Sequence, residues 1–260
     1  MPNSTLQIGG WSTGVMQADV DYLFPLIMLS AILCGGLLLR RSQSSLSLDT
    51  EQRVAVGISA FCGAMLGAKL PFALMDWEGL LAGTTWFTNG KTIMCGMVGA
   101  YFAVEATKWT LNIKAKTGDS FAVPVAVTVA IGRLGCLRAG CCFGVETNLP
   151  WAMRCAATDD LLRHPTQIYE SLFHFSMAGL CYFLIAQGVW KGQIVKLYIL
   201  SYLLYRFATE FLRPELKMGL ELTWYQWFAL LVAPVFLVLW MRDAQQSTNA
   251  HKPTKVEKST

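Results

Sequence analysis

The sequence predicts an all-α, polytopic integral membrane protein with about seven transmembrane helices. Hydrophobic residues occupy 54% of its 260 positions and charged residues only 15%. So few charges cannot cover the surface of a water-soluble globule this apolar. Seven apolar segments also approach the length at which a helix crosses the ~30 Å hydrocarbon core of a bilayer.

The seven segments follow one another through short connections. The third contains Glu105 and the fourth ends in glycines, so the ends of these two are the least defined. The predicted spans lie near residues 21–39, 54–74, 92–107, 120–138, 168–187, 194–212 and 222–241. We interpret residues 1–241 as a single transmembrane domain. Residues 242–260 lack a periodic apolar face and are predicted to form a polar cytoplasmic tail.

The distribution of basic residues predicts the orientation. Twelve Lys and Arg residues lie in the loops and tail on one side of the predicted spans, and six lie on the other side. Because cytoplasmic loops carry the excess of Lys and Arg, we expect the N-terminus outside and the C-terminus in the cytoplasm. The first twenty residues contain no Lys or Arg, so the positive start of a cleavable signal peptide is missing and the first span is predicted to be retained. The net charge is only +4, without a dense basic patch interleaved with aromatic residues, which argues against nucleic-acid binding.

Ionisable residues inside the apolar runs point to a functional site. Arg133 lies in the fourth predicted span, and Arg206 and Glu210 lie in the sixth. A charge at bilayer depth costs roughly 2.5–3.5 kcal/mol even on lenient insertion scales, so such side chains usually face a protected cavity or one another. These residues are therefore the first candidates for function.

A long outer connection, from about Ala139 to Thr166, joins the fourth and fifth predicted spans. Loops of this length are often functional. Glycines at positions 132, 135, 140 and 144 permit either close backbone approach at a site or simple helix packing. The connection is expected to gather one set of polar residues at the outer face: Arg133, Arg138, Arg154, Arg163, His164 and Glu170.

In the sixth span, Tyr202, Arg206, Glu210 and Arg213 follow i, i+4, i+8, i+11 spacing and form one helical stripe. One interpretation is an internal Arg206–Glu210 ion pair with Arg213 directed to the interface. The other is that Glu210 orients an arginine whose free donors bind an anion. A guanidinium group can hold two phosphate oxygens at once, and the most available phosphate in a membrane belongs to phospholipid.

Three ordered segments resemble the prolipoprotein diacylglyceryl transferase family: GRLGCLRAGCCFGVETNLPWAM (132–153), RHPTQIYES (163–171) and YLLYRFATEFLRPE (202–215). Two further segments, LGAKL (66–70) and GKTIMCGMVGAYFAVE (90–105), are similar more weakly. The combination of RHPTQIYE with YRFATEFLR is highly specific. The resemblance covers most of the chain from about residue 60 to 215.

The resemblance implies a seven-span enzyme of the bacterial inner membrane. Such an enzyme transfers a diacylglyceryl group from phosphatidylglycerol to the lipobox cysteine of a preprolipoprotein signal peptide, releases glycerol phosphate and needs no cofactor or metal. Arg133 and Arg206 match the essential arginines of the family, which would hold the phosphate and stabilise the leaving group. The remaining matches would shape the substrate site: Tyr202, Glu210, Gly144, Arg213, Arg163, and the segment from His164 to Glu170 with Gln167 and Tyr169.

Three cysteines depart from the family pattern. Cys136 stands where the usual signature has asparagine, Cys141 where it has glutamate, and Cys95 where a histidine is expected. A thiol cannot act as imidazole or carboxylate does, so the usual acid–base arrangement is incomplete. His164 is the leading candidate for the general base, although it could instead cap the next helix, and Glu210 is the alternative.

The eight cysteines fall into different environments. Cys34, Cys62 and Cys181 lie in apolar runs and are expected to pack as small hydrophobic residues. Cys136, Cys141, Cys142 and Cys155 are expected to lie near the outer face. Their spacing fits neither paired CxxC zinc motifs nor a CxxCH haem site, so no metal is predicted. A disulfide from Cys155 to Cys141 or Cys142 is one interpretation, and simple packing is the other.

Two functions of different classes remain. The first is diacylglyceryl transfer to a protein thiol. The second is a phospholipid-binding or transport protein that keeps the arginine clamp but lacks this catalysis or uses another acceptor. A thiol-redox membrane protein ranks third.

Overall fold

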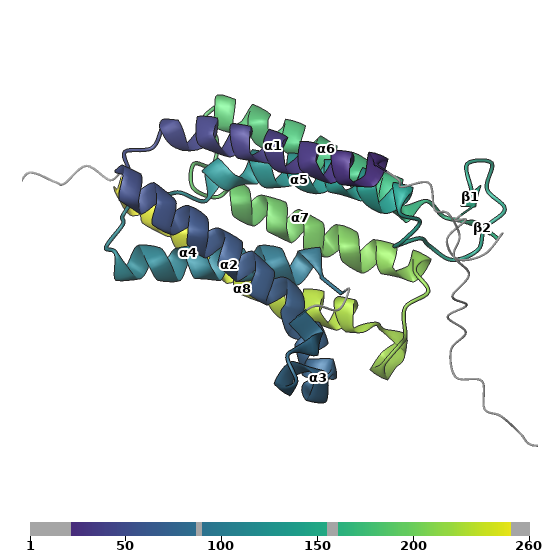
Figure 1. Cartoon of the computed structure of the whole chain (residues 1–260). Helices are drawn as coiled ribbons and strands as arrows, with labels where there is room; N and C mark the ends of the chain where they lie inside the picture. The colour runs from purple at the N-terminus through teal and green to yellow at the C-terminus, as the bar shows by residue number, and fades with distance from the viewer. Residues whose placement is uncertain (1–21, 87–89, 155–160, 251–260) are drawn as a thin grey trace, which may run out of the picture.

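The protein is described from a computed structural model, in which residues 22–86, 90–154 and 161–250 are placed. The long helices of this part run roughly along one direction and form a bundle (Figure 1). They are α1 (Leu23–Ser44), α2 (Thr50–Met75), α4 (Ile93–Thr110), α5 (Asp119–Arg138), α6 (Thr166–Ala186), α7 (Ile194–Thr209) and α8 (Trp224–Ala250). Shorter elements are α3 (Trp77–Leu81), the 3-10 helices Thr84–Trp86, Glu210–Leu212 and Gly219–Glu221, and strands β1 (Met153–Arg154) and β2 (Leu162–Arg163).

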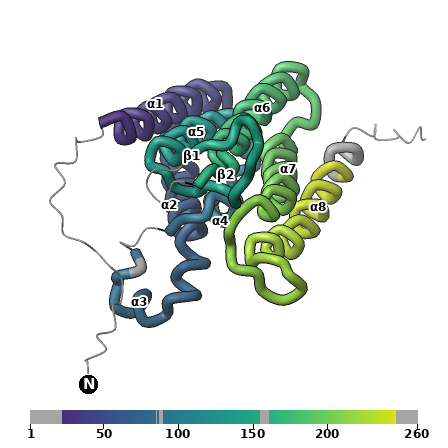
Figure 2. Tube along the Cα trace, turned by 90° about the vertical axis from the view of Figure 1, so that its right-hand side faces the viewer, coloured from purple at the N-terminus to yellow at the C-terminus, as the bar shows by residue number. Residues whose placement is uncertain are grey.

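A small hairpin is the exception to the all-α prediction. Strands β1 and β2 pair antiparallel, with Met153 opposite Arg163 and Arg154 opposite Leu162. Both views show the hairpin at the end of the bundle where α5 ends and α6 begins (Figures 1 and 2). Strands of two residues carry too little periodicity to be seen in the sequence.

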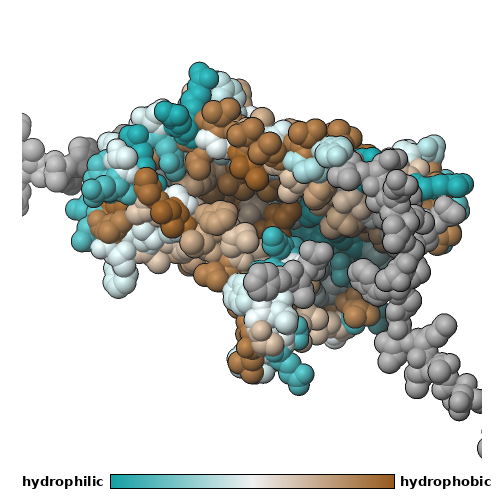
Figure 3. All heavy atoms as spheres, in the orientation of Figure 1, coloured by the Kyte–Doolittle hydropathy of each residue, from teal (hydrophilic) through white to brown (hydrophobic). Residues whose placement is uncertain are grey.

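Five helical segments of the described residues are long and apolar enough to cross a membrane: α1, α2, α5, α6 and Trp224–Gln245 of α8. Many large apolar side chains on them face outward, among them Ile32, Phe61 and Leu231. Figure 3 shows hydrophobic residues gathered across the middle of the bundle and hydrophilic residues at its ends. This surface suits lipid rather than water, which confirms the prediction of a multi-pass helical membrane protein.

The remaining two long helices are shorter or more polar. Helix α7 has 16 residues, and α4 has 18 and includes Glu105 and Lys108. The prediction of seven spans with the N-terminus outside thus stays a prediction. Helix α1 begins at the hairpin end of the bundle and α8 ends at the opposite end, as an odd number of crossings requires (Figure 1).

Small residues allow α2 and α4 to approach closely. A Cβ atom built on Gly63 would lie 2.6 Å from the carbonyl oxygen of Gly99, and one built on Gly67 would collide with the carbonyl oxygen of Cys95. Close backbone contact of this kind is a common means of helix association in membranes. It fixes the start of α4, where Thr92 donates its backbone N–H to the carbonyl of Ala68 at 3.0 Å.

The other helices pack in pairs, α1 on α5, α5 on α6 and α7 on α8. One apolar cluster, including Met94, Leu203 and Phe236, joins α4, α7 and α8. A second, including Ala126 and Tyr198, joins α5, α6 and α7. Helix α7 belongs to both clusters, so its polar stripe is held between two packed layers.

Helix α8 extends into the predicted polar tail and is described as far as Ala250. Asp243, in this extension, pairs with the buried Lys196 of α7 at 2.5 Å. The tail contains no helix-breaking residue before Pro253, and the ion pair gives this helical extension a tertiary contact. Residues 251–260 lie outside the described part of the chain.

Candidate active site

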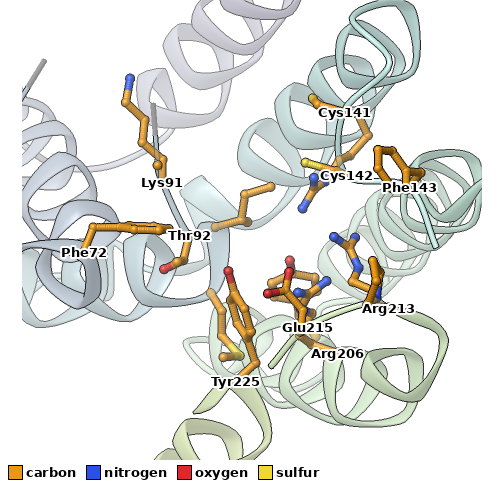
Figure 4. A pocket seen from close by; sticks show the side chains of 16 residues that line it. Phe72, Lys91, Thr92, Cys141, Cys142, Phe143, Arg206, Arg213, Glu215 and Tyr225 are labelled. Carbon is orange, nitrogen blue, oxygen red and sulfur yellow. The ribbon is translucent and has the colours of Figure 1, made fainter. Parts of the chain in front are cut away.

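A cavity of about 460 Å³ opens at the hairpin end of the bundle. Its wall comes from α2, the segment before α4 and the first residues of α4, the end of α5 and the loop that follows, the end of α7 with the segment that follows, and the start of α8. Figure 4 shows Arg206, Arg213, Cys142 and Tyr225 around it. The lining residues are Phe72, Gly90, Lys91, Thr92, Ile93, Met94, Arg133, Cys141, Cys142, Phe143, Tyr202, Arg206, Arg213, Pro214, Glu215 and Tyr225.

Glu170 is the centre of the buried polar network beside this cavity. Its carboxylate accepts hydrogen bonds from Arg133 at 2.6 Å, from Tyr202 Oη at 2.6 Å and from Arg213 at 2.8 Å. Glu170 is only 1% exposed, and its three partners come from α5, α7 and the segment after α7. One carboxylate therefore fixes two arginines and a tyrosine from three elements.

Arg206 is held by a second carboxylate. Its Nη2 lies 2.8 Å from Glu210 Oε2, and Glu210 Oε1 accepts from Thr223 at 3.0 Å. The guanidinium group also lies over the Tyr225 ring, 4.4 Å from its centroid. Arg206 Nη1 is buried and has no hydrogen-bond partner among the described residues. The predicted ion pair thus forms, and it leaves donor capacity at a guanidinium group that lines the cavity.

The buried cluster has an excess of positive charge. Three guanidinium groups, those of Arg133, Arg206 and Arg213, face the two carboxylates of Glu170 and Glu210, which leaves a net charge of +1. Pairing makes burial of the arginines affordable, because an isolated charge in a dry site is costly. The one further lysine and the one further glutamate of the cavity lining cancel each other. With the cysteine thiols neutral, a cavity with this residual charge suits a singly charged anion.

The predicted stripe on the sixth span is only partly helical. Helix α7 ends at Thr209, and Glu210–Leu212 continue as a 3-10 turn. Arg213 then takes an extended backbone conformation, with φ −112° and ψ 145°. Its side chain reaches Glu170 on α6 because the chain leaves the helix there.

The loop after α5 carries Cys141 and Cys142 to the rim of the cavity. Gly140 and Cys142 adopt positive φ angles of 65° and 62°, which turn the chain back across the end of the helix. Both cysteines are free thiols. The pKa of the Cys142 thiol is lowered, because the Cys136 and Cys141 thiols can donate to its thiolate and nearby arginines add positive charge.

The first turn of α6 anchors this loop. Gln167 donates to the carbonyl of Cys141 at 2.5 Å, and Thr166 Oγ1 donates to the carbonyl of Cys142 at 2.6 Å. Gln167 thus positions the rim of the cavity through this hydrogen bond and does not itself line the cavity. The predicted disulfide to Cys155 stays a prediction, because that residue lies outside the described part of the chain.

Gly144 and Arg163 also support the loop and do not line the cavity. A Cβ atom on Gly144 would lie 2.6 Å from the carbonyl oxygen of Leu212 and 2.7 Å from His164 Cβ. Arg163, on β2, lies over the Phe143 ring, 4.9 Å from its centroid. Glycine at position 144 therefore lets the loop, the hairpin and the end of α7 meet.

His164 and Tyr169 lie outside the cavity lining. His164 Nδ1 is 3.3 Å from Tyr169 Oη, which in turn accepts a hydrogen bond from Trp151 Nε1 at 2.7 Å. His164 also exchanges backbone hydrogen bonds with Gly144 and Val145. Its role as general base stays a prediction.

A sequence model of the family described as "Prolipoprotein diacylglyceryl transferase" matches residues 20–242, which is most of the chain. The chain belongs to this family. It is 26% identical over 205 residues to the phosphatidylglycerol–prolipoprotein diacylglyceryl transferase of Clostridium tetani, covering 75% of this chain and 81% of that protein. The protein of that name from Porphyromonas gingivalis is 28% identical, covering 71% of this chain and 72% of its own length. That from Pseudoalteromonas translucida is 31% identical, covering 62% and 63%.

In this member of the prolipoprotein diacylglyceryl transferase family, Arg133, Arg206 and Arg213 line one cavity. No sequence pattern pointed to Glu170 as the carboxylate that holds two of them. Arg133 was selected because it is a charged residue inside an apolar run. Glu170 lies about one turn into the apolar run of α6, so the same criterion could have marked it as a partner for a buried arginine. Tyr225 was missed altogether. Nothing local distinguishes it from the other aromatic residues near the start of α8.

Proposed function

We propose that this chain transfers a diacylglyceryl group from phosphatidylglycerol to the lipobox cysteine thiol of a preprolipoprotein signal peptide. The relatives carry the name of this activity. The observation that carries the proposal is the convergence of Arg133, Arg206 and Arg213 on one cavity with a net charge of +1. The phosphodiester of phosphatidylglycerol carries a single negative charge and matches it.

The arginines would act on the leaving group. In the reaction, the acceptor sulfur bonds to the glyceryl carbon, and the bond from that carbon to the phosphate oxygen breaks. Glycerol phosphate leaves with the electron pair, so negative charge grows on the phosphate. Arg133 and Arg213 are held in place by Glu170, and Arg206 by Glu210. Donors fixed before the reaction stabilise this developing charge without reorganisation.

The cavity is large enough for a head group but not for two acyl chains. A volume of about 460 Å³ lies in the usual range for small-molecule sites. The acyl chains would extend from it among the outward-facing apolar side chains of the bundle. Tyr202 and Tyr225 add aromatic surface between the charged cluster and the apolar wall.

We further propose seven spans in the bacterial inner membrane, with the hairpin end on the outer side. The connections α1–α2, α4–α5 and α6–α7 gather at the opposite end (Figure 1) and include Lys114, Lys116 and Lys191. This clustering supports a cytoplasmic position for that end and for the polar tail 242–260. The cavity would then face phospholipid and an exported signal peptide.

The second candidate function is phospholipid binding or transport without transfer. Cysteine at positions 95, 136 and 141, where the family pattern has other polar groups, favours it. Cys95 is buried in α4 and 5% exposed, so it offers no exposed acid or base. The arginine clamp alone would suffice for binding.

Transfer of labelled diacylglycerol from phosphatidylglycerol to a lipobox peptide by the purified protein tests the proposal. Arg206→Lys should lower kcat/KM at least about 100-fold, because lysine cannot pair with Glu210 and hold phosphate oxygens at once. Arg242→Lys is the matched control, since its side chain is 64% exposed on α8. Absence of labelled peptide with the wild-type protein, despite saturable binding of phosphatidylglycerol, would favour the second candidate.

A further inference from the structure

Three cysteine thiols meet beside the cavity, and two of the three residues, Cys141 and Cys142, line it. Cys136 lies in the last turn of α5, and Cys141 and Cys142 lie in the loop that follows. Their three sulfur atoms lie within 4.8 Å of one another. The C-x4-C-C spacing of these cysteines differs from paired CxxC zinc motifs, but the turn at Gly140 brings the three thiols close together in space.

The backbone of this cluster is fixed before any ligand arrives. The Cys141 N–H donates to the carbonyl of Cys136 at 3.1 Å, and α6 binds the carbonyls of Cys141 and Cys142 through Gln167 and Thr166. The backbone of the loop is thereby held in place. Supporting contacts of this kind hold the ligands of metal sites in place. The Cys141 thiol donates to the carbonyl oxygen of Cys136 at 3.7 Å, a contact that metal binding would replace.

We infer that Cys136, Cys141 and Cys142 bind one Zn²⁺ ion and leave its fourth coordination position open to the cavity. Tetrahedral zinc with bonds of about 2.3 Å to sulfur sets its sulfur atoms about 3.8 Å apart. The observed separations therefore need only small rotations of the side chains. Three protein ligands with one open position are the usual arrangement of catalytic zinc, and thiolates are among its preferred ligands.

The surrounding charge fits such a complex. Zn²⁺ with three thiolates has a net charge of −1, which together with the +1 of the arginine cluster sums to zero. In the zinc-loaded site the phosphodiester would therefore be held by the directed N–H donors of the arginines rather than by net charge. Cys142 lies close enough to Arg133 and Arg213 to feel their positive charge, which stabilises an anionic complex. Cys141 is exposed, so the ion can enter from solvent.

The open position gives this site a role in the proposed reaction, and this part of the inference rests on the proposed function. The acceptor thiol would bind zinc as a thiolate and release its proton to water. Its sulfur would then attack the glyceryl carbon, and the electrons of the broken carbon–oxygen bond would leave with glycerol phosphate. Zinc would thus replace the general base that the family pattern supplies through groups this chain lacks.

Zinc content and thiol protection test the site without relying on activity. Full-length protein in detergent should hold about one Zn²⁺ per chain after equilibration and gel filtration. Alkylation mapped by mass spectrometry should label Cys136, Cys141 and Cys142 at least about tenfold more slowly with Zn²⁺ than with chelator. Cys62, exposed on the outward-facing surface of the membrane helix α2, is the internal control for a membrane-permeant reagent and should react equally in both. Cobalt in place of zinc should give sulfur-to-metal charge-transfer absorption.

Variants sharpen the assignment. Cys142→Ser should weaken zinc binding at least about 100-fold, whereas Cys62→Ser should leave it unchanged. Equal alkylation with and without Zn²⁺ in the wild-type protein would overturn the site. Loss of zinc in Cys155→Ser would contradict the proposed open coordination position, because Cys155 would then be a fourth protein ligand of the ion.

The transfer assay separates this inference from the proposed function. Chelated protein should lose transfer at least about tenfold and regain it with Zn²⁺. Equal transfer by zinc-free and zinc-loaded protein would overturn the activating role and leave the proposed function intact. Stoichiometric zinc binding with no transfer under any condition would overturn the proposed function and leave the metal site standing.

Discussion

Replacing Glu170 with glutamine tests whether one carboxylate organises the site. Glutamine keeps the size of the side chain but removes the charge that pairs with Arg133 at 2.6 Å and Arg213 at 2.8 Å. Glu170 is 1% exposed, and the NH2 group of glutamine would face at least one of the donors from which the carboxylate now accepts. Removing one partner of a buried ion pair costs about 3–5 kcal/mol. If about 3 kcal/mol of this cost falls on the transition state, kcat/KM drops roughly 150-fold.

The assay is transfer of labelled diacylglycerol from phosphatidylglycerol to a lipobox peptide, with thermal unfolding measured in parallel. Glu221→Gln is the matched control, because it removes a carboxylate that pairs with Lys217 and is 83% exposed. It should change kcat/KM by less than about twofold. Each loss of kcat/KM can be expressed as a loss of transition-state stabilisation. In the double variant Glu170→Gln with Arg213→Gln, this loss should be at least about 1 kcal/mol smaller than the sum of the losses in the two single variants. A Glu170→Gln protein that transfers within threefold of the wild type would refute the reasoning.

Three further changes test the packing and the predicted base. Gly63→Ala should lower the thermal unfolding temperature, since its Cβ would lie 2.6 Å from the Gly99 carbonyl oxygen, whereas Gly57→Ala, with open space around it, should not. Gly144→Ala should lower both unfolding temperature and transfer, because three segments meet there; unchanged values would show that the loop can relax. His164→Asn should keep transfer within about tenfold of the wild type across pH, since His164 lies outside the cavity lining; a larger loss with an altered pH profile would mark it as the general base.

The helices were largely predictable because each long apolar run has to satisfy its backbone hydrogen bonds internally in a membrane. The predicted start of the sixth span, residue 194, is the start of α7, and the predicted end of the fourth, residue 138, is the end of α5. The helical continuation of α8 to Ala250 was not predictable from polarity. It depends in part on a contact between Asp243 and Lys196, 47 residues earlier in the chain.

The site was predictable in its residue types but not in its pairings. Arg133 and Arg206 stood out because charge inside an apolar run is costly. The sequence offered Glu210 as the partner of Arg206 because the two lie four residues apart on one helix. The pairing of Glu170 with Arg133 and Arg213 spans 37 and 43 residues, and no helical periodicity reports contacts between different helices. The same limit hid the convergence of the three cysteines, which depends on the turn at Gly140.

The balance of charge in the cavity explains why buried arginines are paired rather than left free. Three unpaired guanidinium groups would bind the phosphodiester and the released glycerol phosphate too tightly for turnover. In the zinc-free site, with Glu170 and Glu210 ionised, the net charge of +1 matches the diester, while the leaving phosphate approaches a charge of −2. The attraction between the arginine cluster and the phosphate therefore grows as the carbon–oxygen bond breaks. Binding that strengthens along the reaction raises kcat, whereas uniformly stronger binding would only lower KM.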